Sequence, residues 1–259
     1  IAGILTQAAE AAGIPAGAIQ FVDSSDRQAV TDLIKMNGLV DVVIPRGGAG
    51  LIQAVVQNAT VPVIETGIGV CHTYVDAGAD YDMARAIAIN AKVQRPAVCN
   101  AMETLLVHED AAAEFLPQML TEYFAAGVTI IGCGKTQAFD KRIQAATEAD
   151  WATEYGDLRL SVKIVSGLEE ALAHIAKYGT KHSECIVTSD YNHARTFQQR
   201  VDAAAVYVNA STRFTDGFEF GFGAEIGIST QKLHARGPMA LPELTSSKYL
   251  ISGDGQIRG

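Results

Sequence analysis

The chain has 259 residues, of which 48% are hydrophobic and 19% are charged, as in globular proteins with a substantial core. Its formal net charge of −9 argues against nucleic acids and anionic membranes as partners, because neither attracts an acidic surface. No apolar run of the sequence is long enough to cross a bilayer. The four cysteines have no C-x-x-C spacing and suggest no disulfide framework, so we expect a reduced, cytoplasmic protein.

Residues 1–64 alternate between helical and strand patterns. We expect helices at 1–12, 27–36 and 51–58, and strands at 18–22, 40–45 and 61–64. The first helix has its stop signals at Gly13 and Pro15, which are typical of a helix C-terminus. The alternation predicts parallel β-α-β units with helices on both faces of a sheet.

The rest of the chain continues the same alternation. We expect helices at 81–94, 110–126, 135–147, 167–178 and 190–200, and strands at 104–108, 128–132, 161–165, 184–188 and 205–208. Residues 209–247 are rich in Gly, Ser and Thr and are interpreted as ordered loop, and 248–252 as an edge strand. The sequence therefore predicts an α/β protein along its whole length.

Cys99 lies in a short connection between a predicted helix and a predicted strand. Pro96 cannot continue the helix, and it biases Arg95 away from helical dihedrals. Nearby cations, Lys92 and Arg95, would favour a thiolate over a thiol. A nucleophilic cysteine would be mounted in this way, although a half-buried structural cysteine fits the local sequence as well.

A glycine-rich segment, residues 46–50, follows an apolar strand and opens a helix. Its glycines, among them Gly47 and Gly48, allow backbone N–H groups to approach a ligand, and a helix N-terminus favours an anion. Arg46 adds a positive charge. The segment fits a contact with a nucleotide phosphate or a nicotinamide ribose, and it fits a tight strand-to-helix turn equally well.

Glu65 follows the next predicted strand, where a carboxylate would face an active cleft if the strands are parallel. It suits a general base or a residue that orients water, and the more common alternative is a solvated carboxylate at a strand end. Cys71 and His72 have no further ligands at suitable spacing, so we expect no metal site.

Two cationic loops occur near the end of the chain. One spans 209–215 and contains Arg213, and the other spans 234–238 and contains His234 and Arg236. These side chains donate hydrogen bonds to carboxylate or phosphate oxygens, which favours an anionic substrate. The alternative is that each makes a local salt bridge on the surface.

Six segments together resemble a known family. They are residues 44–50, 67–72, 94–100, 208–217, 222–227 and 232–239. With these segments the chain resembles the gamma-glutamyl phosphate reductases (glutamate-5-semialdehyde dehydrogenases), which are members of the aldehyde dehydrogenase superfamily. The matching segments run through nearly the whole chain and are specific to this reductase family.

The resemblance implies a three-layer α/β fold with parallel sheets and helices on both faces. It implies part of a Rossmann-like dinucleotide-binding domain at 1–64 and a catalytic domain at 65–208. Residues 209–259 would form substrate loops that return to the cofactor domain, and a terminal oligomerisation strand. The resemblance also implies a homo-oligomer, either a dimer or a tetramer.

The resemblance further implies an NADPH-dependent enzyme that reduces L-glutamyl 5-phosphate to L-glutamate 5-semialdehyde in proline biosynthesis. The implied catalytic residues are Cys99 as nucleophile and Glu65 at the superfamily's base position. For such a mechanism we expect the backbone N–H of Cys99 or of Asn100 to donate to the oxyanion. The implied cofactor-binding residues are Arg46, Gly47, Gly48 and Glu154, the last near the nicotinamide ribose. The implied substrate-binding residues are Arg95, Ser211, Arg213, His234 and Arg236.

Members of this family carry roughly a further domain's worth of residues before the point where this chain starts. We therefore expect a companion chain, an omitted N-terminal segment, or a fragment with little activity of its own.

Two alternatives for the function also follow from the sequence. One is another NAD(P)-dependent aldehyde dehydrogenase, and the other is a non-catalytic fragment or oligomerisation module.

Overall fold

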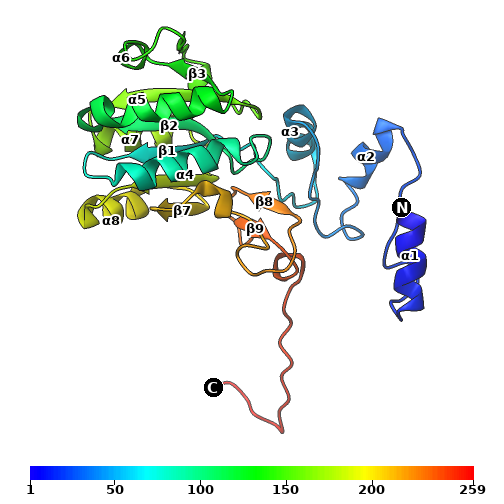
Figure 1. Cartoon of the computed structure of the whole chain (residues 1–259). Coiled ribbons are helices and arrows are strands. Elements are labelled where there is room, and N and C mark those ends of the chain that lie inside the picture. The colour runs from blue at the N-terminus through cyan, green and yellow to red at the C-terminus, as the bar shows by residue number, and fades with distance from the viewer. The chain divides into compact units, whose positions relative to one another are not determined.

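The computed structural model describes residues 1–259, apart from the side chain of Ala49. The chain divides into two compact units, Ile1–Ile64 and Glu65–Gly259. The N-terminal unit contains helices α1 (Ala2–Ala11), α2 (Arg27–Leu33) and α3 (Ala49–Asn58), shown in blue at the start of the chain in Figure 1. Asp26 begins α2 by accepting a hydrogen bond from the Gln28 N–H, as an N-cap residue does.

The three strands predicted in the N-terminal unit are absent from its described residues, so that prediction is wrong. The segments 40–45 and 61–64 meet only in an isolated parallel bridge between Val43 and Val63. Two backbone bonds of 2.9 Å flank this bridge, from Val43 N to Pro62 O and from Ile64 N to Val43 O. Pro62 has no N–H to extend the ladder, and a strand pair this short is not stable alone.

The larger unit is built on a sheet of seven strands in the order β4-β3-β5-β2-β1-β6-β7, and every pair in it is parallel. Its strands are β1 (Cys71–Val75), β2 (Met102–His108), β3 (Thr129–Gly132), β4 (Gln144–Ala145), β5 (Arg159–Val165), β6 (Ser183–Val187) and β7 (Ala205–Val208). A separate antiparallel pair consists of β8 (Gly227–Ser229) and β9 (Gly237–Met239). The predicted parallel arrangement is therefore correct for this unit.

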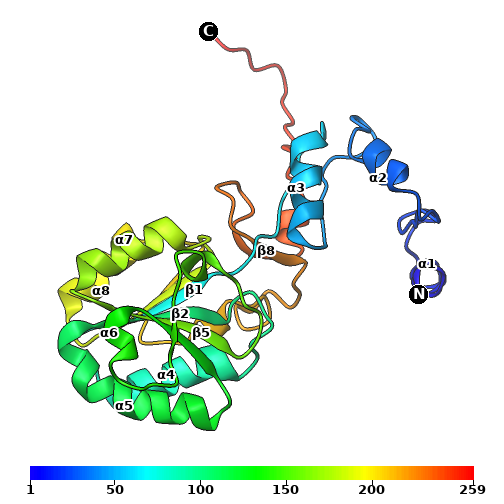
Figure 2. The ribbon, with the colours of Figure 1, turned by 90° about the horizontal axis from the view of Figure 1, so that it is seen from above.

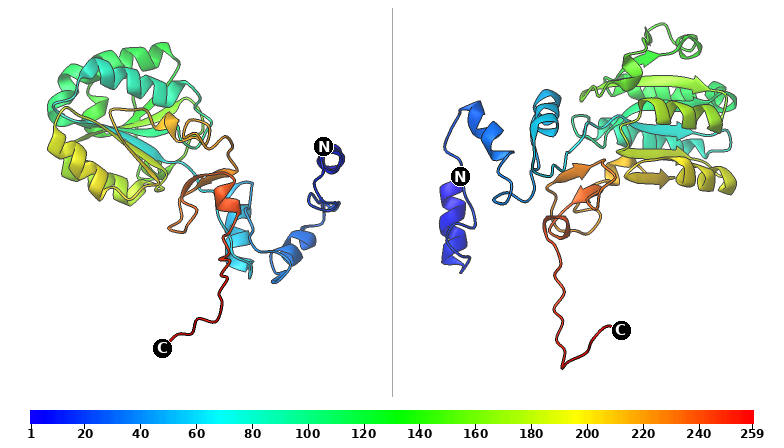
Figure 3. Two further views of the ribbon diagram at one scale, coloured as in Figure 1. Left: turned by 90° about the horizontal axis from the view of Figure 1, so that it is seen from below. Right: turned by 180° about the vertical axis from the view of Figure 1, so that it is seen from behind.

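Helices cover both faces of the sheet (Figures 2 and 3). They are α4 (Tyr81–Val93), α5 (Glu109–Ala125), α6 (Gly134–Gln137), α7 (Leu168–Tyr178) and α8 (Tyr191–Arg200), with 3₁₀ turns η1 (Asp150–Ala152), η2 (Thr212–Phe214) and η3 (Pro242–Leu244). One core cluster joins α4 and α5 to the sheet, and another joins α7 and α8 to its other face. Because helices cover both faces, β1 is buried along its whole length and β2 is buried except at His108.

Three further predictions fail in the larger unit. Strand β1 was not predicted, because its polar residues His72 and Thr73 hide an otherwise buried strand. The helix expected at 135–147 stops at Gln137, because Ile143 packs against Gly132 and residues 144–145 pair with β3. The edge strand expected at 248–252 does not form, and residues 245–259 contain no regular element after η3.

Cys99 lies between α4 and β2, at the amino end of the central strands. The loops that precede β1 and β6 lie at the same edge, since all these strands are parallel. The loop after β7 also reaches this edge, because Thr212 and Thr215 bond to Asn100. The fold thus brings three loops together around one thiol.

Candidate active site

Cys99 occupies a tight turn of four residues, 98–101, which we call the nucleophile turn. The Ala101 N–H donates to the Val98 carbonyl at 2.9 Å, so Cys99 and Asn100 are the two central residues. Cys99 is partly exposed, whereas Asn100 is 4% exposed. The turn therefore presents the thiol and buries the residue after it.

Asn100 fastens the nucleophile turn to the loop that follows β7. Its side-chain amide donates to the Thr215 carbonyl at 2.8 Å and to the Arg213 carbonyl at 3.3 Å. The Thr212 hydroxyl donates to the Asn100 carbonyl at 2.8 Å. Because the side-chain amide is used in this way, only the backbone N–H of Asn100 suits the predicted role at an oxyanion.

The charges around Cys99 differ from those expected from sequence. Burial, together with the negative charges of Glu225 and Glu154, raises the pKa of the Cys99 thiol to about 11. Its own backbone N–H and the Arg213 guanidinium lower it. A pKa this high favours the thiol at neutral pH, in contrast to the thiolate that the nearby cations led us to expect.

Lys92 does not act on the thiol as predicted, because it is fully buried and paired elsewhere. Its Nζ lies 2.7 Å from Glu103 Oε2, and the two side chains are 0% and 1% exposed. Burial lowers the pKa of Lys92 and raises that of Glu103 to about 7. The helical periodicity of the sequence could have revealed the burial of Lys92, because Lys92 follows Ala84 and Ala88 at four-residue spacing on the buried face of α4.

Glu154 lies beside the nucleophile turn, as its effect on the thiol shows. Its Oε1 accepts the Gly69 N–H at 2.9 Å, which ties the segment before β1 to the segment before β5. Glu103 holds the same segment two residues later, because its Oε1 accepts the Gly156 N–H at 3.2 Å. The buried Lys92–Glu103 pair thus supports the position of Glu154.

Glu65 lies at the start of the loop that precedes β1 and is half-buried. Its N–H donates to Gln231 Oε1 at 2.9 Å, which joins this loop to the β8–β9 segment. Among the described residues, no hydrogen bond joins the Glu65 carboxylate to Cys99. The structure places Glu154 and Glu225 among the charges that act on the thiol, and Glu225 was not predicted as a site residue.

A cavity of about 240 Å³ opens beside Arg213. Its lining residues are polar apart from one aromatic ring, and they are Asn90, Gln94, Arg213, Phe214, Asp216 and Glu219. Gln94 Oε1 accepts the Arg213 Nε–H at 2.9 Å, which fixes the plane of the guanidinium and leaves its terminal nitrogens as donors. Burial and the charge of Arg95 lower the pKa of Arg213, so two cations are close together here.

The other predicted substrate residues have different surroundings. Ser211 Oγ accepts the Arg213 N–H at 3.3 Å and so begins η2. Arg236 donates to Asp202 Oδ1 at 2.8 Å, and His234 is exposed on the segment between β8 and β9. Among the described residues, no hydrogen bond or ion pair joins these two side chains to the nucleophile turn.

The predicted cofactor residues Arg46, Gly47 and Gly48 belong to the N-terminal unit. Gly48 is the N-cap of α3, so the glycine-rich segment does open a helix. A Cβ on Gly47 would lie 2.6 Å from Leu51 Cδ2, so a side chain at this position would displace Leu51. No strand precedes this segment in the described part of the chain, so the strand-to-helix turn of the alternative interpretation does not form as such, and the ligand contact stays a prediction.

A family model described as "Aldehyde dehydrogenase family" matches residues 1–130. The chain belongs to the aldehyde dehydrogenase family. It is 65% identical over 255 residues to a gamma-glutamyl phosphate reductase of Moorella thermoacetica. This alignment covers 98% of this chain and 61% of that protein. It is 60% identical over 258 residues to a reductase of the same name from Thermoanaerobacter pseudethanolicus, covering 100% of the chain and 62% of that protein.

A crystal structure of gamma-glutamyl phosphate reductase from Thermotoga maritima superposes with a TM-score of 0.96 at 50% identity. The alignment covers 100% of this chain and 62% of that one, so the chain spans about three fifths of its relatives' length. The predicted aldehyde-dehydrogenase-like α/β fold is confirmed, and so is the resemblance to gamma-glutamyl phosphate reductases.

Two residues beside the nucleophile turn were not predicted from the sequence, Glu225 and Gly69. Glu225 Oε2 accepts the Gly217 N–H at 3.0 Å, and the charge of Glu225 raises the thiol pKa. The segments 222–227 and 67–72 were recognised as family motifs, which was the signal available for both. Among the described residues, no group of three or more His, Cys, Asp or Glu side chains could hold a metal ion.

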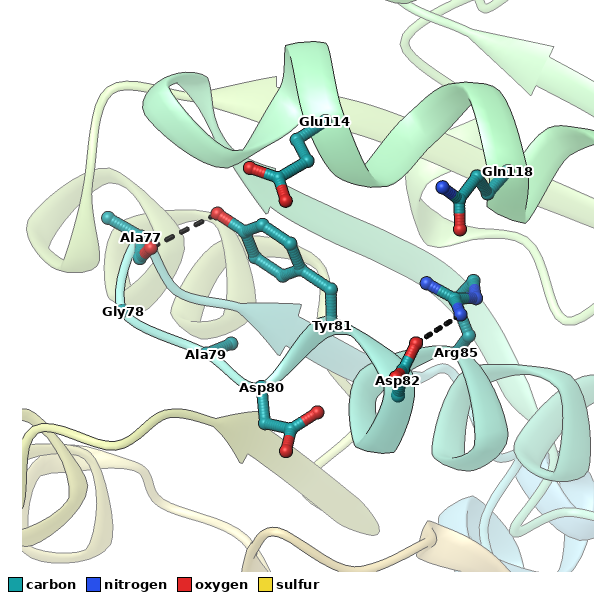
Figure 4. A pocket seen from close by; sticks show the side chains of 9 residues that line it. All are labelled: Ala77, Gly78, Ala79, Asp80, Tyr81, Asp82, Arg85, Glu114 and Gln118. Atoms are coloured by element: carbon teal, nitrogen blue, oxygen red, sulfur yellow. Dashed lines mark hydrogen bonds and ion pairs between the residues drawn. The ribbon is translucent and has the colours of Figure 1, made fainter.

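A second cavity, of about 520 Å³, lies at the opposite edge of the sheet (Figure 4). It is lined by the loop after β1, the first turn of α4, and two residues of α5, Glu114 and Gln118. Its polar groups are partly paired, since Tyr81 OH donates to the Ala77 carbonyl at 3.1 Å and Arg85 pairs with Asp82. Because it follows β1 whereas Cys99 precedes β2, it is separate from the candidate active site.

No helix in the described part of the chain is both long and apolar enough to span a membrane.

Proposed function

We propose that the protein to which this chain belongs catalyses the NADPH-dependent reduction of L-glutamyl 5-phosphate to L-glutamate 5-semialdehyde, with release of phosphate, in proline biosynthesis. The observation that carries the proposal is the identity of 60–65% to curated gamma-glutamyl phosphate reductases over nearly the whole chain. Cys99, at the centre of the candidate active site, supplies the nucleophile.

The first step is attack of the Cys99 sulfur on the acyl carbon. A C–S bond forms, the bond from carbon to the phosphate oxygen breaks, and phosphate leaves. Because the thiol pKa is about 11, its proton must be taken up as the C–S bond forms. We assign Glu225, a carboxylate whose negative charge raises the thiol pKa, as the proton acceptor.

The acyl oxygen gains negative charge in this step and needs hydrogen-bond donors. The backbone N–H of Cys99 already lowers the pKa of its own thiol, so it is directed toward the sulfur. We assign this N–H and that of Asn100 to the developing oxyanion. Two such donors stabilise the transition state, and removal of one typically costs about 10²–10³ in rate.

Arg213 is the best-placed residue for the anionic end of the substrate. Its positive charge is partly buried and is repelled by Arg95, so a bound carboxylate or phosphate would relieve this repulsion. In the same cavity, Asp216 and Glu219 are suited to an α-ammonium group. The cavity beside Arg213 therefore matches an amino acid that carries both charges.

Glu154 fits a nicotinamide dinucleotide. Its Oε1 is occupied by the Gly69 N–H, which leaves Oε2 to accept a ribose hydroxyl next to the thiol. When bound, the dinucleotide supplies the hydride that reduces the thioester. Gly47 and Gly48, at the N-terminus of α3, offer a backbone without side chains to a phosphate or ribose.

We further propose a cytoplasmic homo-oligomer. All four cysteines are free, which is typical of a reducing compartment. In the C-terminal segment Tyr249, Leu250 and Ile251 are 90%, 84% and 91% exposed, and apolar side chains in such a segment suit a subunit contact. Light scattering on the full-length protein tests this, and a monomer at micromolar concentration would contradict it.

The reaction is tested with the full-length protein in the reverse direction, as NADP-linked oxidation of L-glutamate 5-semialdehyde. We expect Cys99→Ala to lose activity and Cys133→Ala, a second partly exposed cysteine, to keep it. The reaction should require phosphate, because the thioester is released by phosphate. Oxidation without phosphate would indicate a hydrolytic aldehyde dehydrogenase, and an inert thiol with no dinucleotide binding would indicate a non-catalytic module.

A further inference from the structure

The peptide that joins Cys99 to Asn100 is the central peptide of the nucleophile turn. Turn types I and II differ mainly by a flip of this peptide, and type II needs a positive φ at the third residue. Asparagine tolerates that conformation, so the sequence at Asn100 does not prevent the flip. In the structure Asn100 has a negative φ, which excludes type II and so defines one orientation of the peptide.

Two neighbours contact the Cys99 carbonyl. The Cys71 thiol donates to this oxygen at 3.2 Å, and Cys71 is fully buried at the start of β1. The backbone of Gly69 lies against the same oxygen, since a Cβ on Gly69 would be only 1.6 Å from it. Burial raises the pKa of Cys71 well above its usual value, so the group stays a thiol and keeps its donor.

Cys71 is itself part of a buried polar network that returns to the same turn. Its Sγ lies 3.8 Å from His182 Nδ1, which lies 2.8 Å from Ser183 Oγ. Ser183 Oγ lies 2.6 Å from Thr215 Oγ1, and the Thr215 carbonyl accepts the Asn100 side-chain amide at 2.8 Å. The network therefore contacts both central residues of the turn, Cys99 through Cys71 and Asn100 through Thr215.

We propose that Cys71 is a positioning residue that fixes the orientation of the Cys99–Asn100 peptide and thereby directs the Asn100 N–H toward the acyl oxygen. This rests on the proposed acyl transfer to Cys99. A trans peptide is planar, so a carbonyl held on the buried side points the N–H to the opposite side. A flipped peptide would replace that donor with a carbonyl oxygen, which repels the developing oxyanion.

The test compares Cys71→Ala and Cys71→Ser with Cys185→Ala in the full-length protein. Cys185 is equally buried, on β6, and is a matched control for loss of a core thiol. For Cys71→Ala we expect kcat to fall about 10-fold or more, with KM within about 2-fold, because the affected donor acts in the transition state. Cys71→Ser keeps a donor and should recover most of kcat, and Cys185→Ala should retain it.

The proposal is overturned if Cys71→Ala keeps kcat within about 2-fold of the parent, or if Cys71→Ser is no better than Cys71→Ala. If Cys71→Ala does not fold, Cys71→Val, which fills the same space without a donor, takes its place. The rate at which iodoacetamide alkylates Cys99, followed by peptide mass spectrometry, separates this idea from the proposed function. We expect a decrease of about 3-fold in Cys71→Ala that Cys71→Ser reverses. An unchanged rate in a protein without reductase activity would defeat both proposals.

Discussion

Replacing Lys92 with methionine should destabilise the larger unit severely. The Lys92 ammonium and the Glu103 carboxylate are 2.7 Å apart and both are buried, so the variant leaves an uncompensated buried acid. Breaking a buried pair in this way typically costs about 3–5 kcal/mol of unfolding free energy. For a unit of this size that corresponds to a fall of roughly 6–20 °C in the melting temperature. The Gly156 N–H would also lose its fixed acceptor, which loosens the segment that carries Glu154.

The effect should depend on pH with a definite sign. The folded-state pKa of Glu103 is about 7, above its usual value of 4.5, so the folded protein binds this proton more tightly than the unfolded chain. Stability contributed by this group therefore falls as pH rises from about 4.5 to 7. Without Lys92 the positive charge that lowers this pKa is lost, so in Lys92→Met the fall extends above pH 7.

Urea unfolding of the full-length protein at about pH 5.5 and pH 8 measures this. Lys92→Met should lose more stability at the higher pH, and adding Glu103→Leu should restore most of the loss at both. Lys135→Met is the control, because the Lys135–Glu109 pair is exposed and its loss should leave the midpoint unchanged. A loss below about 1 kcal/mol, or a double variant as unstable as the single one, would refute the reasoning.

Three further predictions concern the nucleophile turn. Because the Cys99 pKa is about 11, its alkylation by iodoacetamide should keep accelerating with pH up to about pH 10, and Arg213→Gln should slow it at about pH 8; a plateau below pH 9 would contradict this. Gly69→Ala would place a Cβ 1.6 Å from the Cys99 carbonyl, so we expect activity to fall more than about 100-fold or the protein to be insoluble, and normal turnover would be inconsistent with this packing. Asn100→Ala removes hydrogen bonds to the carbonyls of Arg213 and Thr215 and should lower the unfolding free energy by roughly 1–3 kcal/mol. Urea unfolding measures this change, and an unchanged midpoint would contradict the prediction.

Much of the larger unit could be predicted from sequence, because its helices have periodic apolar faces and its strands are short apolar runs. Strand β1 escaped this approach, since His72 is acceptable in a buried strand only with Glu184 of β6 beside it, at 2.9 Å. The helix expected at 135–147 had adequate helical propensity. It was overridden by the packing of Ile143 against Gly132, which no local pattern reveals.

The N-terminal unit shows the opposite error. Its apolar segments 40–45 and 61–64 have strand propensity, but strand structure also requires a partner along its length. Among the described residues of this unit, only two isolated bridges, Val43–Val63 and Asn37–Val40, supply one. Propensity therefore marked segments that favour strand structure and could not say whether they form a ladder.

The sequence by itself predicted which cysteine is the nucleophile and which loops accompany it, because a nucleophile and its motifs are local patterns of residue type. The tertiary structure decided the electrostatic environment of that thiol. Lys92, seven positions away in sequence, is directed into the core toward Glu103, whereas Arg213, Glu154 and Glu225 reach the thiol from distant loops. The reason is physical: a charge acts through space and burial, and both are set by how α4, β2 and the loop after β7 pack together.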